Sequence, residues 1–183
     1  MDTRLFVRFV AVTVMLSALS GCASLSKSEC LNANWEDIGV RDGADGRPEE
    51  YLIRHTTACA KVAVTPDREA WLAGRDQGLD RFCVPYRAYQ LGEYGWSFDA
   101  GICRRYDQDR LVNAYERGLE VRRLGEEVDS IQSEIQSLRT ALEKEELAPK
   151  EREHMAWRIG RLEYQRNDAQ AAYEAARYSA RNL

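Results

Sequence analysis

The feature that most constrains this chain is a pair of apolar heptad series near its C-terminus. The first series alternates intervals of three and four residues, the spacing of a coiled-coil seam, and comprises Val121, Leu124, Val128, Ile131, Ile135, Leu138 and Leu142. The second repeats the alternation with Met155, Ile159, Leu162, Arg166, Ala169, Tyr173 and Ala176. Each member has a counterpart in the other series such that the two residue numbers sum to 297. A constant sum is what antiparallel helices require, so the pattern predicts a helical hairpin.

Charge and capping signals agree with this hairpin. Residues 120–147 hold eight acidic and four basic side chains, whereas residues 150–183 hold seven basic and five acidic ones. We expect an antiparallel coiled coil over residues 107–183 with its turn near residues 147–150, about Pro149. Arg166 is the polar seam member: its guanidinium is expected to reach solvent, with a register-setting role as the alternative. Trp157 lies off the seam and marks a candidate contact surface.

The first 22 residues have the layout of an export signal, with two arginines, an apolar run over residues 9–19 and small residues after it. The run is shorter than the roughly 20 residues that a membrane-spanning helix needs. Leu19-Ser20-Gly21-Cys22 resembles the lipobox of bacterial lipoprotein precursors, which implies removal of a signal peptide over residues 1–21 and lipidation of Cys22 with acyl chains such as palmitate. Ala23 follows where inner-membrane lipoproteins commonly carry Asp, so the resemblance favours the outer membrane, facing the periplasm. A plain secretory signal is the alternative.

Four further cysteines precede the hairpin, namely Cys30, Cys59, Cys83 and Cys103. An even number of cysteines in an exported chain is typical of a disulfide framework. Their spacings of 29, 24 and 20 residues do not resemble those of zinc ligands. Pairing Cys30 with Cys59 and Cys83 with Cys103 closes the shortest loops and is the favoured one of three possible pairings.

Residues 22–106 are predicted to form a small helical head that the disulfides hold together. Ser26 and Glu29 fit a capping box that opens a helix over about residues 27–42. Further helices are expected to begin at Pro48, after Asp67 and at Pro85, and the Gly- and aromatic-rich stretch 92–103 to be an irregular loop. With the hairpin, this makes the fold all-α.

An aromatic residue followed by glycine three or four positions later recurs through the head. The stretches are Trp35…Gly39…Gly43, Trp71…Gly74…Gly78, Tyr89…Gly92…Gly95 and Tyr115…Gly118. Glycine inside a helix costs about 1 kcal/mol relative to alanine, so its recurrence indicates a compensating gain. We interpret it as close approach of helix backbones. The alternative is an aromatic groove for glycan or peptide, with Trp71, Tyr89, Tyr94 and Trp96 as binding residues.

These residues, together with the cysteines, resemble an uncharacterised family of bacterial lipoproteins that is catalogued only as a domain of unknown function. The matching positions span about residues 20–120 and include Cys30, Trp35-Glu36-Asp37-Ile38-Gly39, His55, Cys59, Trp71, Gly74-Arg75, Cys83 and Cys103. The resemblance implies an envelope lipoprotein and brings no activity, substrate or catalytic residue with it. The C-terminal hairpin is not part of it.

Few residues suggest catalysis or metal binding. His55 is the only histidine of the head, and we expect a half-buried packing residue, with binding or acid–base catalysis as the alternative. Asp42 and Asp45 lack the alternating pattern of a calcium loop, and no serine lies in a nucleophile-elbow motif. We therefore expect no enzyme, metal or cofactor. A net charge of −4 gives no basic surplus for nucleic acid.

The sequence thus predicts an exported, lipid-anchored envelope protein that acts as a structural or protein-interaction module. Its lipid would hold it to the membrane, and the hairpin would contact an envelope protein or a second copy of the chain. The alternative function is a lipoprotein that binds cell-wall glycan or peptide with the aromatic head.

Lipidation of Cys22 makes processing of the precursor sensitive to globomycin, an inhibitor of the lipoprotein signal peptidase. We expect treated cells to accumulate a chain that still carries residues 1–21, which migrates more slowly on a gel. Processing that the drug leaves unaffected would refute the anchor.

Overall fold

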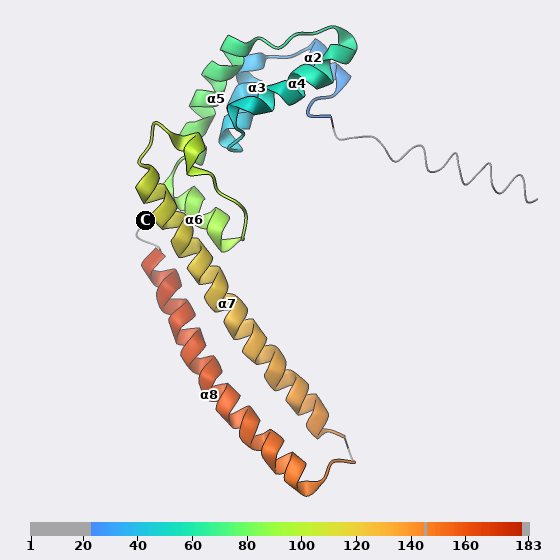
Figure 1. Ribbon diagram of the computed structural model, residues 1–183, viewed down its shortest axis with the longest axis vertical. Helices are drawn as coiled ribbons and strands as arrows, with labels where there is room; N and C mark the ends of the chain where they lie inside the picture. The colour runs from blue at the N-terminus through green and yellow to red at the C-terminus, as the bar shows by residue number, and fades with distance from the viewer. Residues whose placement is uncertain (1–22, 145, 181–183) are drawn as a thin grey trace, which may run out of the picture. The chain divides into compact units, whose positions relative to one another are not determined.

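The structure, a computed structural model, describes residues 23–144 and 146–180, and this part of the chain contains helices and no strand. The α-helices are α2 (Lys27–Leu31), α3 (Trp35–Ala44), α4 (Leu52–Cys59), α5 (Arg68–Phe82), α6 (Pro85–Glu93), α7 (Gln108–Leu142) and α8 (Pro149–Ser179) (Figure 1). Short 3-10 helices are η2 (Glu49–Tyr51), η3 (Ala60–Val62) and η4 (Ala100–Cys103). The all-α prediction is confirmed. Among the described residues, no helix is both long and apolar enough to cross a membrane.

The chain divides into two compact units, and the division falls between Gly78 and Leu79, inside α5. The first unit contains α2, α3, α4 and most of α5, and the second contains the end of α5 with α6, α7 and α8. The predicted boundary between head and hairpin lies between residues 106 and 107. The difference arises because α6 packs along α7, so the second disulfide belongs to the same unit as the hairpin.

Each unit carries a disulfide among its described residues. Cys30 of α2 is bonded to Cys59 of α4, and Cys83 is bonded to Cys103 of η4, as the shortest-loop pairing predicted. All four cysteines are buried. A bridge of this kind stabilises a small domain by about 2–4 kcal/mol, in large part by restricting the unfolded chain.

Capping side chains set the helix ends in the first unit, and one of these caps corrects a predicted helix. The Ser26 hydroxyl accepts from the Glu29 backbone N–H at 3.2 Å, and the Glu29 carboxylate accepts from the Ser26 N–H at 2.7 Å, which confirms the capping box. The prediction of one helix over residues 27–42 is wrong, because Asn34 accepts from the Asp37 N–H at 3.3 Å and caps a new helix, α3. Helix α3 continues to Ala44, so Asp42 lies in its last turn.

Helices α3 and α5 cross with their backbones in contact at glycines on both sides. A Cβ atom at Gly39 would lie 2.1 Å from the Trp71 carbonyl oxygen, and one at Gly74 would lie 1.9 Å from the Glu36 carbonyl oxygen. The second glycine of each helix makes an equivalent contact one turn further along, Gly43 with Arg75 and Gly78 with Val40. A side chain at these positions would overlap the facing backbone. The repeated glycines therefore allow close helix packing, as we interpreted them.

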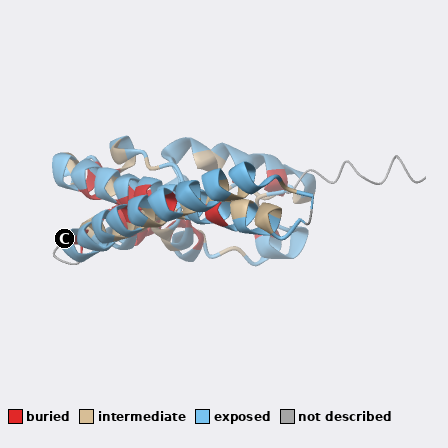
Figure 2. Cartoon of the chain, turned by 90° about the horizontal axis from the view of Figure 1, so that it is seen from below, coloured by how far each residue is buried: buried red, intermediate tan, exposed pale blue. Residues whose placement is uncertain are grey.

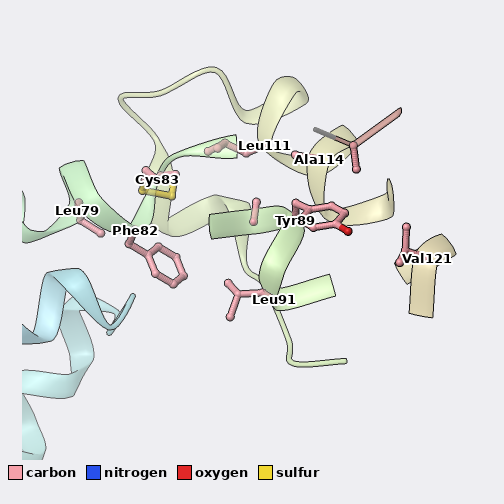
Figure 3. Packing of buried hydrophobic residues seen from close by; sticks show 11 residues of the cluster. Leu79, Phe82, Cys83, Tyr89, Leu91, Leu111, Ala114 and Val121 are labelled. Carbon is pink, nitrogen blue, oxygen red and sulfur yellow. A yellow bond between two sulfur atoms is a disulfide. The ribbon is translucent and has the colours of Figure 1, made fainter. Parts of the chain in front are cut away.

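Helices α6 and α7 repeat this arrangement in the second unit. A Cβ at Gly92 would lie 2.2 Å from the Tyr115 carbonyl oxygen, and one at Gly118 would lie 2.1 Å from the Tyr89 carbonyl oxygen. The four aromatic–glycine stretches of the sequence thus form two pairs, and the two helices of each pair pack against each other at their glycines. Around the second pair, Leu79, Phe82, Cys83, Ala88, Tyr89, Leu91, Cys103, Leu111, Ala114, Val121 and Ala180 form the buried core shown in Figure 3.

Helices α7 and α8 lie side by side and antiparallel (Figure 1). All fourteen members of the two heptad series are buried or half-buried, and the rest of both helices is largely exposed (Figure 2). Ile135 and Leu162, a pair with the sum of 297, are 0% and 6% exposed. The hairpin turn lies between Leu142 and Pro149, where two N–H groups of Arg152 donate to carbonyls at the end of α7.

Polar residues flank the seam of the hairpin. Arg139 pairs with Glu163 at 2.6 Å, and Arg158 pairs with Glu134. Arg166 is half-buried, and its guanidinium donates to the side chain of Gln132 on α7 at 3.2 Å. Its charged end thus lies at the edge of the seam, as expected for a side chain whose stem packs inside.

Replacing Gly74 with alanine is expected to lower the free energy of unfolding by about 3 kcal/mol, because the methyl group would overlap the Glu36 carbonyl. The matched control is Gly160→Ala in α8, where a Cβ meets nothing within 4 Å; it is expected to stabilise by about 0.5–1 kcal/mol. Urea unfolding of the chain from Ala23, followed by circular dichroism, measures both. Equal effects of the two substitutions would contradict the backbone contact.

Candidate functional site

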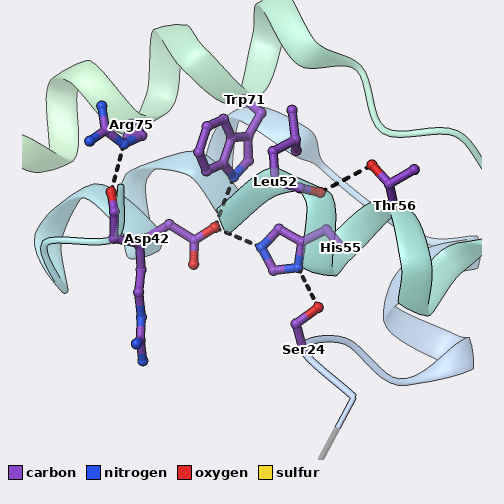
Figure 4. Close-up of polar contacts among 8 residues, drawn as sticks. Ser24, Asp42, Leu52, His55, Thr56, Trp71 and Arg75 are labelled. Atoms are coloured by element: carbon purple, nitrogen blue, oxygen red, sulfur yellow. Dashed lines mark hydrogen bonds and ion pairs between the residues drawn. The ribbon is translucent and has the colours of Figure 1, made fainter. Parts of the chain in front are cut away.

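Three helices of the first unit converge on the carboxylate of Asp42 (Figure 4). Trp71 Nε1 of α5 and His55 Nε2 of α4 each lie 2.8 Å from Asp42 Oδ2. The other imidazole nitrogen, His55 Nδ1, lies 2.9 Å from Ser24 Oγ, just ahead of α2. Trp71, His55 and Asp42 are 0%, 2% and 9% exposed. We call these four residues the Asp42 network.

The carboxylate of Asp42 accepts two of the three hydrogen bonds in the network. An ionised carboxylate only accepts hydrogen bonds, so Trp71 Nε1–H and His55 Nε2–H both donate to Asp42. His55 Nδ1 and the Ser24 hydroxyl share the third hydrogen bond. No buried side-chain nitrogen or oxygen lacks a partner in the part of the chain that the structure describes. A fully satisfied buried network of this kind holds its elements in one arrangement.

Arginine and tyrosine side chains surround the network. Arg75, which is 4% exposed, donates from Nε to the Arg47 carbonyl oxygen at 2.7 Å, and its guanidinium lies 6.0 Å from the Trp71 ring centroid. The Tyr51 ring meets the His55 ring edge-on at 5.2 Å, and the Arg47 guanidinium lies 4.8 Å from the Tyr51 centroid. These contacts connect the segment after α3 to α4 and α5.

A cavity of about 220 Å³ adjoins the Asp42 network. Its lining is mostly polar and charged and includes Ser24, Asp42, Arg47, Tyr51 and His55. The volume lies below the range of about 300–1,000 Å³ that is usual for small-molecule sites. An open groove of about 440 Å³ lies at the break between α2 and α3, and its lining combines polar side chains with apolar surface.

Ser24, His55 and Asp42 follow the hydroxyl–imidazole–carboxylate order that activates a serine nucleophile. Such a site also needs open access and donors for the developing oxyanion. Here the imidazole is 2% exposed, and the carboxylate oxygen that holds it also accepts from Trp71. We therefore interpret the network as stabilising.

No pattern in the sequence predicts this network. A half-buried His55 was expected, whereas the imidazole is buried and hydrogen-bonded through both nitrogens. Ser24 and Asp42 come from segments 31 and 13 residues away from His55, so no local motif links them. The available signal was a polar residue, Asp42, between Gly39 and Gly43 on the face of α3 that packs against another helix.

The structure separates the aromatic residues that were proposed to bind a ligand. Trp71 and Tyr89 are 0% and 7% exposed and lie inside the two units, so their assignment as stacking residues is wrong. Burial, with smaller contributions from Glu93, raises the pKa of the Tyr89 phenol to about 12. Tyr94 and Trp96 remain available: both are more than half exposed, and their ring centroids are 5.3 Å apart.

Lipidation of Cys22 stays a prediction. Cys22 lies outside the described residues. No group of three or more His, Cys, Asp or Glu side chains in the described ranges could hold a metal ion.

An exposed surface runs along α8, and Trp157 is the one residue of it that was predicted from the sequence. Eight residues at alternating intervals of three and four form a second heptad stripe on the helix face opposite the seam: His154, Trp157, Arg161, Tyr164, Asp168, Ala171, Ala175 and Tyr178. All eight are exposed, and Trp157, Tyr164 and Tyr178 are 61%, 70% and 69% exposed. We call this set the outer stripe of α8.

Fold and site together define an all-α, disulfide-bonded protein with a buried polar network and a long helical hairpin. Residues 34–120 match the family described as "Protein of unknown function (DUF2799)", which confirms the resemblance to an uncharacterised family. The match includes Asp42, His55 and Trp71 and ends within α7, so most of the hairpin lies outside it. No curated protein and no solved structure was found to match the chain.

Substituting Asp42 with alanine removes the acceptor that two buried donors share. We expect the free energy of unfolding to fall by about 3 kcal/mol, since the Trp71 indole and the His55 imidazole lose their partner. Asp45→Ala, three residues away on the exposed end of α3, is the control and should change stability by less than about 0.5 kcal/mol. Urea unfolding compares them, and a neutral Asp42→Ala would show that the network does not stabilise the first unit.

Proposed function

We propose that this protein is a lipid-anchored envelope protein of the outer membrane that faces the periplasm and acts as a protein-interaction module. In this proposal the hairpin presents the outer stripe of α8 to a protein partner. The single observation that carries the proposal is the exposure of three large aromatic residues at coiled-coil spacing on that stripe. No catalytic role is proposed.

The chemistry of the stripe suits a protein interface. Tyrosine, tryptophan and arginine are enriched among the residues that dominate binding energy. The Arg161 guanidinium lies 4.9 Å from the Trp157 ring centroid, and the His154 ring stacks on the same indole at 6.5 Å. These neighbours restrict the orientation of the indole before binding, which reduces the entropy lost when a partner covers it.

The exposed face of α7 has a different character. Four of its charged side chains and Glu126 form pairs within the helix, Arg122 with Glu126 at 2.8 Å and Arg123 with Glu120 at 2.8 Å and Glu127 at 3.2 Å. Exposed pairs of this kind contribute at most about 1 kcal/mol and keep a surface solvated. The contrast with the aromatic stripe supports α8 as the interacting helix of the proposal.

The start of the described chain defines how short the tether of the proposed anchor would be. Ser24 is hydrogen-bonded to the buried His55, and only Ala23 stands between Ser24 and the cysteine of the lipobox-like motif. A lipid on Cys22 would therefore be attached through a very short tether to the first unit. Multiple acyl chains hold a protein stably at a membrane, whereas one chain binds marginally.

A second candidate function is binding of cell-wall glycan or peptide. The specific observation in its favour is the exposed Tyr94–Trp96 ring pair. Hydrogen bonds hold its backbone against α7: Arg122 donates to the Tyr94 carbonyl at 2.8 Å, and the Tyr115 hydroxyl donates to the Trp96 carbonyl at 3.2 Å. Retention on purified peptidoglycan that Trp96→Ala abolishes would favour this alternative.

In-cell photo-crosslinking tests the interaction module. A photoreactive residue at Tyr164, on the outer stripe of α8, is expected to give one discrete protein adduct that mass spectrometry identifies. The same residue at Ser130, an exposed position on α7, is the matched control and is expected to give none. Absence of an adduct from Tyr164, or equal and diffuse labelling from both positions, would overturn the proposal.

A further inference from the structure

We propose that the occupant of the outer stripe of α8 is the outer stripe of a second copy of this chain, packed antiparallel about a two-fold axis. The inference rests on the proposed function in taking this stripe as the interaction surface, and it names the partner. It would join two hairpins through their α8 helices.

The spacing of the stripe is the same in both directions. Its intervals run 3, 4, 3, 4, 3, 4 and 3 from His154 to Tyr178, so an antiparallel copy places every member opposite another member. Facing residue numbers then sum to 332. A two-fold symmetric interface requires such a self-complementary surface.

The residues that this register brings together fit one another. Trp157 faces Ala175 and Arg161 faces Ala171, so a large side chain meets a small one in both layers. His154 faces Tyr178 as an aromatic pair at each end of the interface. Tyr164 faces Asp168, where a phenol can donate to a carboxylate. The two-fold axis repeats each of these contacts.

Charge selects the antiparallel direction. A parallel pair would place Arg161 against Arg161 and Asp168 against Asp168, and like charges facing each other oppose association. In the antiparallel pair, Arg161 of one copy lies within one helical turn of Asp168 of the other. Opposite charges therefore approach twice, symmetrically about the axis.

Neighbouring antiparallel registers fit less well. A shift by one heptad in one direction places Trp157 opposite Asp168. The opposite shift places Trp157 opposite Asn182, beyond the end of α8 at Ser179. The register with the sum of 332 is the one that pairs all eight members of the stripe.

The aromatic side chains supply a large part of the area that a specific interface needs. Three side chains per copy are 61–70% exposed, and an aromatic side chain buries about 150–250 Å² when covered. Six of them supply about 800 Å², or roughly two-thirds of the 1,200 Å² at which specific interfaces begin. The alanines, the Arg161 stem and the adjoining helix surface would add to this area.

Disulfide trapping in cells tests the partner and the register together. One tagged full-length copy carries Arg161→Cys and a differently tagged copy carries Ala171→Cys. Facing positions can bring two Cα atoms within the roughly 7 Å that a disulfide needs. Each position lies about 15 Å from its own equivalent in the dimer, at about 1.5 Å per residue. We therefore expect a disulfide-linked heterodimer and no homodimer of either single variant.

Controls separate this outcome from unspecific thiol pairing. The unsubstituted chain, which retains Cys22, measures the background, and a Ser130→Cys copy replaces Arg161→Cys as the partner on α7. Adding Tyr164→Ala and Tyr178→Ala should reduce the heterodimer at least fivefold, whereas Trp96→Ala should leave it unchanged.

Other outcomes would overturn the inference in distinguishable ways. Homodimers of Arg161→Cys would indicate a parallel pair. No heterodimer, combined with a Tyr164 adduct to a different protein, would overturn self-association and leave the proposed function standing. No heterodimer and no adduct would overturn both.

Discussion

The reciprocal glycine contact between two crossing helices is the constraint on which both units depend. In the first unit, Gly39 touches the Trp71 carbonyl, and this contact sets the distance and the rotation of α5 relative to α3. Asp42 follows Gly39 by almost one turn on the same face, so the indole nitrogen of Trp71 meets its carboxylate. The buried network is therefore a consequence of the backbone contact. A larger residue at the crossing would move the indole away from its acceptor.

The same contact in the second unit supports the base of the hairpin. Gly92 and Gly118 hold α6 against the first turns of α7, and Tyr173 and Ala176 of α8 pack against the resulting core. Further along, the partner of α7 in the described chain is α8, and Ile135 and Leu162 are the buried pair there. A two-helix ribbon buries one face of each helix. The opposite face of α8 is left exposed, and this is the face that carries the aromatic stripe.

Periodic and local patterns made much of this fold predictable. The seam from Val121 to Leu142 and its counterpart were correct, because a heptad repeat needs only a second helix of the same period to bury it. The Ser26 capping box and the disulfide pairing were also correct. The break at Asn34 was missed because an asparagine can lie inside a helix or cap a new one. Which of the two occurs depends on how the flanking segments, α2 and α3, pack in the folded unit. The burial of Trp71 and Tyr89 was missed because exposure depends on which helices pair.

The sequence by itself determined the all-α class and the pairing of two long antiparallel helices, since these follow from spacing along the chain. It also contained the aromatic–glycine repeats that make close packing possible. Only the tertiary structure decided which repeats pair, where the two units divide, and that Ser24, Asp42, His55 and Trp71 form one network. The physical reason is that these outcomes depend on contacts between segments far apart in the chain. A glycine allows two helix backbones to approach closely, but the identity of the second helix decides which side chains become buried.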